Sequence, residues 1–134
     1  MNDMAFQEMG LDALMKELKE LGRVDELAPR MLEAAAPILE KEMKKQVRMQ
    51  ADKGYATGDL ENAVTHGEAK KNQYGHYITV TAEGKDRKGM RNNEKLAYLN
   101  YGTSKQQARP VIATAVKKAE NDCINAMQEE MTGE

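Results

Sequence analysis

The longest helical pattern in the chain runs from Val24 to Val47 and reads VDELAPRMLEAAAPILEKEMKKQV. Its apolar residues recur every three or four positions, which is the spacing of an amphipathic helix: Val24, Leu27, Met31, Ala35, Ile38, Leu39, Met43 and Val47. Pro29 and Pro37 interrupt the pattern, and a proline inside a helix removes a backbone hydrogen bond and crowds the preceding turn. Pro29 is compatible with the first turn of the helix, whereas Pro37 should kink the helix or split it. We therefore predict a long, kinked helix.

Helical patterns also occur on both sides of this stretch. Upstream, apolar residues at helical spacing lie between Gly10 and Gly22: Leu11, Leu14, Met15, Leu18 and Leu21. Downstream, the segment from Val111 to about Met131 carries a similar apolar stripe: Ile112, Ala115, Val116, Ala119, Cys123, Ala126 and Met127. Pro110 directly precedes it and suits the first position of a helix. These patterns predict a short helix before the long one and a further helix at the C-terminal end.

The middle of the chain carries the strand signals. His76–Ala82 reads HYITVTA, with β-branched residues and alternation typical of a strand. Residues 67–75 are polar and predict a hairpin arm or a loop, and residues 96–101 predict a strand or a short helix. The order of elements favours an α+β fold with two N-terminal helices, the second long and kinked, a small antiparallel sheet and a C-terminal helix. Its 134 residues predict one domain, 1–134.

Composition excludes several classes of protein. A single cysteine, Cys123, excludes an intramolecular disulfide framework and a zinc site built on a thiolate cluster. No apolar run is long enough to cross a membrane, and the start of the sequence lacks the basic and apolar regions of a secretory signal. We therefore expect an intracellular protein without a membrane partner. Ten methionines and few aromatic residues predict an adaptable core, or one that a partner completes.

Charge is segregated along the chain. Residues 1–42 carry a net charge of −5, residues 43–118 a net charge of +8, and residues 119–134 a net charge of −5. This pattern can steer copies of the chain into head-to-tail contact, or present a positive face to a polyanion, unless it is simply solvated surface. The total of −2 argues against a dedicated nucleic-acid binder. Residues 83–93 predict a mobile basic loop, whose bases are Lys85, Arg87, Lys88 and Arg91.

No group of residues predicts catalysis. His66 and His76 lie in unlike contexts, and no third or fourth metal ligand accompanies them. Cys123 lies on an apolar stripe, where a small buried side chain is expected rather than a nucleophile. Ser104 lacks the sequence pattern of a nucleophile elbow. We therefore predict no catalytic, metal or cofactor-binding residues, no cofactor and no small-molecule substrate.

Two short motifs are more informative. Thr57-Gly58-Asp59-Leu60 predicts the hydroxyl cap of a short helix. Residues 97–110 read AYLNYGTSKQQARP, in which Gly102 permits a positive φ and Thr103 can bond its own backbone. Pro110 fixes φ for helix entry, and Arg109 can pair with a carboxylate of a neighbouring element or subunit. Tyr98 and Tyr101 favour either packing in the core or turn, or a role as interface anchors.

These motifs, in this order, resemble the gene-10-like family of head–tail joining, or tail-completion, proteins of tailed phages and prophages. Members show a Thr-Gly-x-Leu motif after a long helix, then a Tyr-Ala-x-x-x-Glu-aromatic-Gly-Thr strand and Ala-x-Pro-aromatic before a C-terminal helix. Here Asn100 replaces the Glu, Tyr101 replaces a Phe, and Val111 follows the proline. The resemblance assigns the family motif, as an interaction site, to Thr57, Gly58, Leu60, Tyr98, Tyr101, Gly102, Thr103, Arg109 and Pro110.

The resemblance implies a structural assembly protein at the junction of head and tail. It would form a ring with copies of itself, commonly of six in such necks, and contact other neck or tail proteins. It would be in the host cytoplasm during assembly and then in the virion, with weak DNA contact at most. The alternative is a small nucleic-acid-binding module that uses the loop bases together with the basic residues of the middle segment: Lys41, Lys44, Lys45, Arg48 and Lys53.

Overall fold

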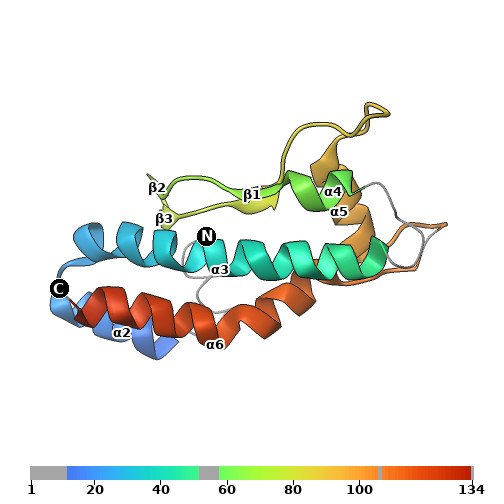
Figure 1. Cartoon of the computed structure of the whole chain (residues 1–134). Coiled ribbons are helices and arrows are strands. Elements are labelled where there is room, and N and C mark those ends of the chain that lie inside the picture. The colour runs from blue at the N-terminus through green and yellow to red at the C-terminus, as the bar shows by residue number, and fades with distance from the viewer. Residues whose placement is uncertain (1–11, 52–57, 106, 134) are drawn as a thin grey trace.

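The computed structural model describes residues 12–51, 58–105 and 107–133, and confirms the α+β class (Figure 1). The described elements are, in chain order, helices α2 (Asp12–Leu21), α3 (Val24–Ala51) and α4 (Asp59–Ala63), strands β1 (Val64–His66), β2 (Lys70–Asn72), β3 (Gly75–Tyr77) and β4 (Val80–Ala82), and helices α5 (Asn92–Tyr101) and α6 (Val111–Thr132).

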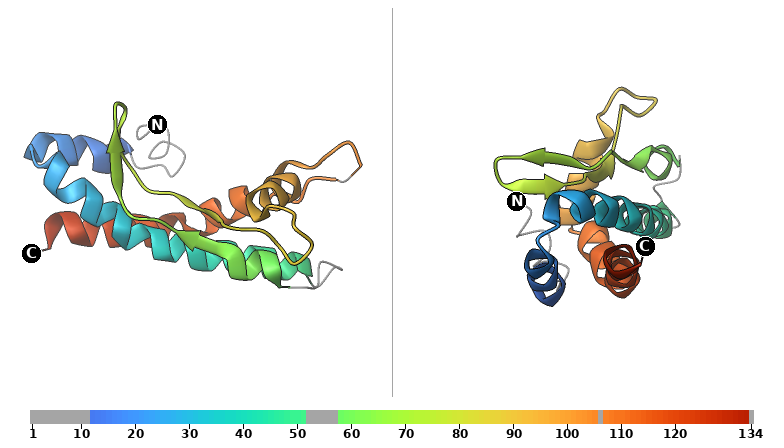
Figure 2. Two further views of the ribbon diagram at one scale, coloured as in Figure 1. Left: turned by 90° about the horizontal axis from the view of Figure 1, so that it is seen from above. Right: turned by 90° about the vertical axis from the view of Figure 1, so that its left-hand side faces the viewer.

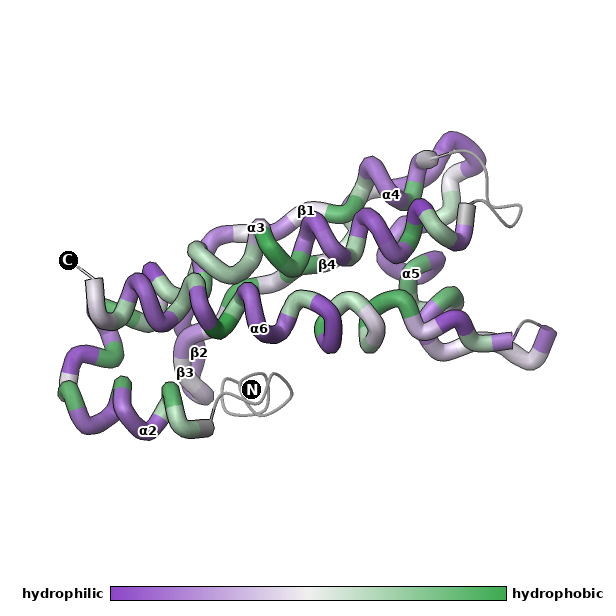
Figure 3. Tube along the Cα trace, turned by 60° about the horizontal axis from the view of Figure 1, so that its bottom comes forward, coloured by the Kyte–Doolittle hydropathy of each residue, from purple (hydrophilic) through white to green (hydrophobic). Residues whose placement is uncertain are grey.

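An antiparallel pair of helices, α3 and α6, forms the long axis of the molecule (Figure 1). Alternating hydrophilic and hydrophobic residues along both helices provide the faces that pack together (Figure 3). On α6 the buried positions recur every fourth residue: Val111, Ala115, Ala119, Cys123, Met127 and Met131. Two contacts set how the pair is aligned: the Cys123 thiol donates to the Ala35 carbonyl oxygen at 3.6 Å, and Arg30 pairs with Glu130 at 3.3 Å.

The elements form three layers. The strands lie on one side of α3, while α6 and α2 lie on its other side (Figure 2). The buried core divides into two clusters along this axis. One cluster joins α2 and the first half of α3 to the C-terminal half of α6, and the other joins the end of α3 to β1, β4, α5 and the start of α6.

Helix α3 is continuous across both prolines. It begins at Val24, so Pro29 lies inside the helix, and its expected place in the first turn is wrong. Pro37 does not split the helix either. The first turns of α3 run obliquely to the rest of the helix, which agrees with the kink expected from internal proline (Figure 2). Packing against α6 therefore stabilises α3 and compensates for the destabilising effect of its two internal prolines.

The strands form two small antiparallel sheets rather than one. In the first sheet Val64 pairs with Ala82, and in the second Lys70 pairs with Tyr77. The single strand expected over residues 76–82 is therefore wrong in its continuity, because residues 78–79 belong to neither sheet. There the side chain of Ile78 packs against the buried cluster of α2, α3 and α6. The polar segment before it does form a hairpin arm, β2 and β3.

Residues 96–101 belong to helix α5, so the strand that the family resemblance implied at this place is wrong. The buried residues of α5 are Asn92, Leu96, Leu99 and Asn100, and their three- and four-residue spacing is helical. The helix ends at Gly102, whose φ of 80° lies in the region that favours glycine. Tertiary burial against the second core cluster thus selects the helix over the strand.

Candidate interaction surface

The motif residues gather at one end of the molecule. Helices α4 and α5 and the loops 83–91 and 102–110 all lie at the end where α3 stops and α6 begins (Figure 1). We call this region, residues 58–63 and 83–110 without the undescribed residue 106, the motif end. The structure therefore brings together two motifs that are about 40 residues apart in the sequence. Thr57, to which a capping hydroxyl was assigned, lies outside the described residues.

The first motif turns the chain into α4. Gly58 is the N-cap residue, with a φ of 77°, and its carbonyl oxygen accepts the Asn62 N–H at 3.0 Å. A side chain at this φ would be strained, which gives the motif its need for glycine. Leu60 is partly buried against the second core cluster. Gly58 and Leu60 thus shape and anchor the turn.

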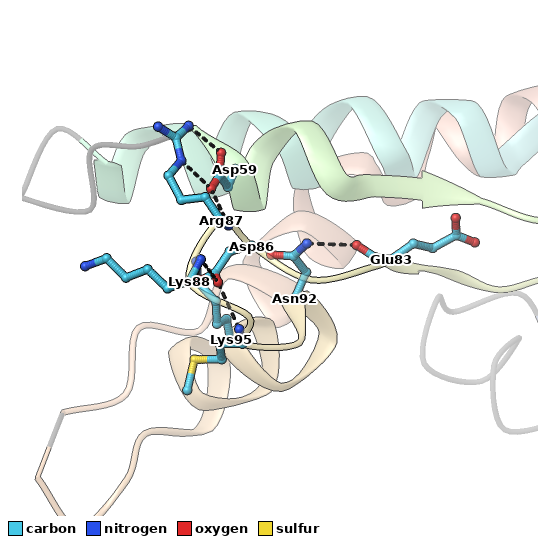
Figure 4. Close-up of polar contacts among 8 residues, drawn as sticks. Asp59, Glu83, Asp86, Arg87, Lys88, Asn92 and Lys95 are labelled. Carbon is cyan, nitrogen blue, oxygen red and sulfur yellow. Dashed lines mark hydrogen bonds and ion pairs between the residues drawn. The ribbon is translucent and has the colours of Figure 1, made fainter.

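Asp59 joins this turn to the basic loop (Figure 4). The Arg87 guanidinium donates to both carboxylate oxygens of Asp59, from Nε at 2.9 Å and from Nη2 at 2.7 Å. The Arg87 backbone N–H also donates to Oδ2, at 3.2 Å. These hydrogen bonds lower the pKa of Asp59 to about 2. We call this two-residue contact the Asp59–Arg87 clamp.

The loop is also folded around a carboxylate of its own, Asp86 (Figure 4). Its Oδ1 accepts the backbone N–H groups of Lys88 and Met90, each at 2.9 Å, and its Oδ2 accepts Lys95 Nζ at 2.9 Å. The hydrogen bond from Lys95, and then those from the backbone, lower the pKa of Asp86. The loop therefore has a defined shape, and the mobility expected of it stays a prediction.

These contacts leave the four predicted loop bases in two groups. Arg87 pairs with Asp59, and Arg91 pairs with Glu94 at 3.0 Å. Lys85 and Lys88 are exposed and make no ion pair within the described part of the chain. Two of the four bases are therefore structural in this conformation, and two are available to a partner.

The second motif closes α5 and returns the chain to α6. The Gly102 N–H donates to the Tyr98 carbonyl oxygen at 2.8 Å. Thr103 Oγ1 accepts the Lys105 N–H at 3.1 Å, which is the local backbone bond expected of this residue. The Arg109 N–H donates to the Leu99 carbonyl oxygen at 2.7 Å and brings the loop back beside α5. Pro110 is the N-cap residue of α6.

Asn100 caps α6 from a neighbouring helix. Its Oδ1 accepts the Ile112 N–H at 2.9 Å and the Ala113 N–H at 3.3 Å, and these are among the N–H groups that a helix start leaves unbonded. Pro110 makes no side-chain cap of its own. The sequence reasoning noted Asn100 only as a departure from the family pattern and missed this role. The signal was a helix start without a capping hydroxyl or carboxylate.

Large apolar side chains are exposed at the motif end. The exposed fraction is 75% for Tyr101, 43% for Tyr98 and 44% for Met90. The two tyrosines therefore do not pack in the core, which leaves turn packing or interface contact. A shallow groove runs beside Tyr101 between α5 and α6, where Ile112, Ala113 and Val116 line it. Large exposed apolar side chains beside a groove suit a contact surface.

The remaining candidate residues serve the framework. His66 Nδ1 contacts Glu40 Oε1 and His76 Nε2 contacts Asp25 Oδ1, each at 2.7 Å, so both histidines tie the strands to α3. Burial raises the pKa of Cys123 to about 11. Within the described residues no three His, Cys, Asp or Glu side chains are placed to share a metal ion, and no helix is long and apolar enough to span a membrane.

Some of the basic residues that would bind nucleic acid under the alternative hypothesis form ion pairs within the chain. Lys44 pairs with Glu40 at 3.9 Å and Arg48 pairs with Glu61 at 2.9 Å. Lys41 and Lys45 are exposed on α3. Lys53 lies outside the described residues.

Comparison with known proteins gives one match. The family model described as "Bacteriophage HK97-gp10, putative tail-component" matches residues 12–102, from the start of α2 to the glycine that ends α5. No curated protein and no solved structure matches the chain. The match covers most of the sequence, and includes both the turn at Gly58 and the segment that ends at Gly102. The chain therefore belongs to the HK97-gp10-like family, and is a structural component of a bacteriophage tail.

Proposed function

We propose that this tail component works at the head–tail junction, where it forms a ring with copies of itself and completes the neck or tail. The observation that carries the proposal is the motif end. It is a shaped region with exposed Tyr98, Tyr101 and Met90, placed at one extremity of an elongated subunit. A surface of this kind suits contact with a neighbouring protein.

Such a protein would act through the complementary shape and charge of the surfaces that it presents to its neighbours. Its work would be the burial of apolar area and the pairing of charges between neighbouring subunits, with no bond made or broken. The Asp59–Arg87 clamp and the bonds around Asp86 hold the loop in one conformation. A surface that is already ordered loses less conformational entropy on binding. We take residues 1–134 as one domain with this single role.

The ion pairs on α3 weaken the nucleic-acid alternative. Lys44 and Arg48 already neutralise acidic neighbours, which reduces the number of phosphates that this face would contact. Contact with DNA in the channel of a ring would then fall mainly to Lys41 and Lys45. We propose that such contact is weak and secondary to protein contacts.

The test is complementation of a phage, or an induced prophage, that lacks this chain. We expect separate heads and tails to accumulate without the chain, and the wild-type chain to restore joined particles. A Tyr98→Ala/Tyr101→Ala variant should fold normally, because both side chains are exposed. It should lower the infectious titre by at least about tenfold, since aromatic residues dominate interface energetics.

A matched control is Tyr74→Ala, which removes another exposed tyrosine at the tip of the β2–β3 hairpin, far from the motif end. Electron microscopy of the lysates separates a joining defect from a failure to make tails. Joined particles made without the chain would contradict the proposal, and so would a full titre from the double tyrosine variant.

A further inference from the structure

The motif end and the C-terminal part of α6 carry opposite charge. At the motif end, Lys85, Lys88 and Lys105 are exposed and have no ion-pair partner among the described residues. The acids beside them are mostly occupied: Asp59 by Arg87, Asp86 by Lys95 and Glu94 by Arg91. The surface that a partner would meet therefore combines basic side chains without ion pairs and exposed apolar side chains.

The C-terminal half of α6 has the complementary character. From residue 121 onward the helix contains no Lys or Arg, while Asp122, Glu129 and Glu130 lie along it. Only Glu130 among these acids has an ion-pair partner in the described part of the chain, Arg30. We call residues 121–132 the acidic half of α6.

These two surfaces cannot meet within one molecule. Helix α6 begins at the motif end and runs away from it, so its acidic half lies toward the opposite extremity (Figure 1). A contact between them therefore needs two molecules. Because the surfaces differ, the contact is heterologous, and each copy keeps one of its two surfaces for a further copy. Repetition of this contact closes a ring when the rotation per subunit fits.

We propose that the motif end of one copy docks on the acidic half of α6 of the next copy. Lys85, Lys88 and Lys105 face Asp122 and Glu129, while Tyr98, Tyr101 and Met90 supply apolar contact area. This inference rests on the self-association in the proposed function, and it names the two surfaces that associate. Opposite charge at the rim of an interface steers encounter and fixes orientation.

Charge reversal on each surface tests the contact. Lys85→Glu/Lys88→Glu should weaken self-association by about tenfold or more, because two repulsions replace two attractions, and so should Asp122→Lys/Glu129→Lys. Combining the four changes should restore association toward the wild-type level. The matched control, Lys41→Glu/Lys45→Glu, makes the same charge change on exposed lysines of α3. Mass in solution is measured against protein concentration by sedimentation.

Cross-linking identifies the surfaces directly. The native Cys123 is buried, so a cysteine introduced at the surface reacts selectively. We expect a mixture of Lys88→Cys and Glu129→Cys proteins to form cross-linked dimers with a short bis-maleimide. Neither protein alone should form them, since each then presents a thiol on only one of the two surfaces.

The outcomes separate this inference from the proposed function. If the wild-type chain associates but neither charge reversal weakens it, the inference is wrong and the ring proposal stands. Cross-links formed equally well within one variant would show that like surfaces meet, which also overturns the inference. A wild-type chain that stays monomeric at all concentrations, with no cross-links, would overturn both.

Discussion

At the scale of single residues, the side-chain amide of Asn100, in helix α5, caps the start of helix α6. Replacing Asn100 by alanine would leave the Ile112 and Ala113 N–H groups without their acceptor at a partly buried helix start. We expect the free energy of unfolding to fall by about 1–2 kcal/mol, the usual cost of a lost cap. Urea denaturation, followed by circular dichroism, measures the change.

Asn93→Ala serves as the control, because Asn93 lies on the same helix and is exposed. Asn100→Asp keeps a side-chain oxygen near the N–H groups, and should lose less stability than the alanine variant. Equal denaturation midpoints for Asn100→Ala and Asn93→Ala would contradict the capping role.

Residue-level roles were predictable where the contact is local. The turn roles of Gly102 and Thr103 follow from their own sequence, because both bonds span a few residues. The Asn100 cap joins residues twelve positions apart and depends on the path of the intervening loop. The Asp59–Arg87 clamp spans 28 residues and two elements. No periodicity or motif encodes such distances. The sequence therefore indicated only a run of loop bases, whereas among the described residues two of these bases form ion pairs and two do not.

At the scale of elements, the Asp59–Arg87 clamp fixes the basic loop to α4. Its folded-state pKa of about 2 lies below the ordinary value of 3.8, so the clamp stabilises the folded state above that ordinary value and is lost as pH falls through about 2. In Arg87→Gln the pKa of Asp59 should rise toward 3.8, because the guanidinium supplies most of the hydrogen bonding. Carbon-detected NMR titration of the side chain measures this.

The control for the clamp is Arg91→Gln, which removes a loop base that pairs with Glu94 instead. The titration of Asp59 should stay at its wild-type midpoint in that variant. A midpoint near 3.8 in the wild-type protein would show that the clamp does not persist in solution.

The elements themselves divide into those that local pattern determines and those that packing determines. The stripes of α2, α3 and α6 were visible because each buries one face over many turns. Helix α5 was ambiguous because its apolar segment is short, and burial of Leu96 and Leu99 decides it. The alternation over residues 76–82 predicted extended chain correctly, but it does not say where the partner strand changes. Which strands pair depends on the tertiary structure, so the sequence did not predict that the strands form two separate sheets.

At the scale of the whole molecule, two oppositely charged surfaces lie apart in space. Part of the basic middle segment supplies the motif end, and the acidic last segment supplies the acidic half of α6. Because α6 starts beside α5 and runs the length of the subunit, the fold places the lysines of the motif end and the acids of the acidic half of α6 far apart along its axis (Figure 1). Such a separation favours ordered, end-directed encounters between copies over random ones.

This arrangement makes self-association dependent on salt. Raising the ionic strength from about 0.05 M to about 0.5 M shortens the screening length to below about 5 Å, which weakens attraction between exposed charges. We expect the apparent dissociation constant to rise severalfold across this range, while circular dichroism stays unchanged. In the Lys85→Glu/Lys88→Glu variant the apparent dissociation constant should rise less with salt, or should fall. The reason is that salt also screens the repulsion between the introduced glutamates and the acidic half of α6. Association that strengthens with salt in the wild-type chain would mean that apolar contacts at Tyr98, Tyr101 and Met90 dominate, and that charge does not direct the assembly.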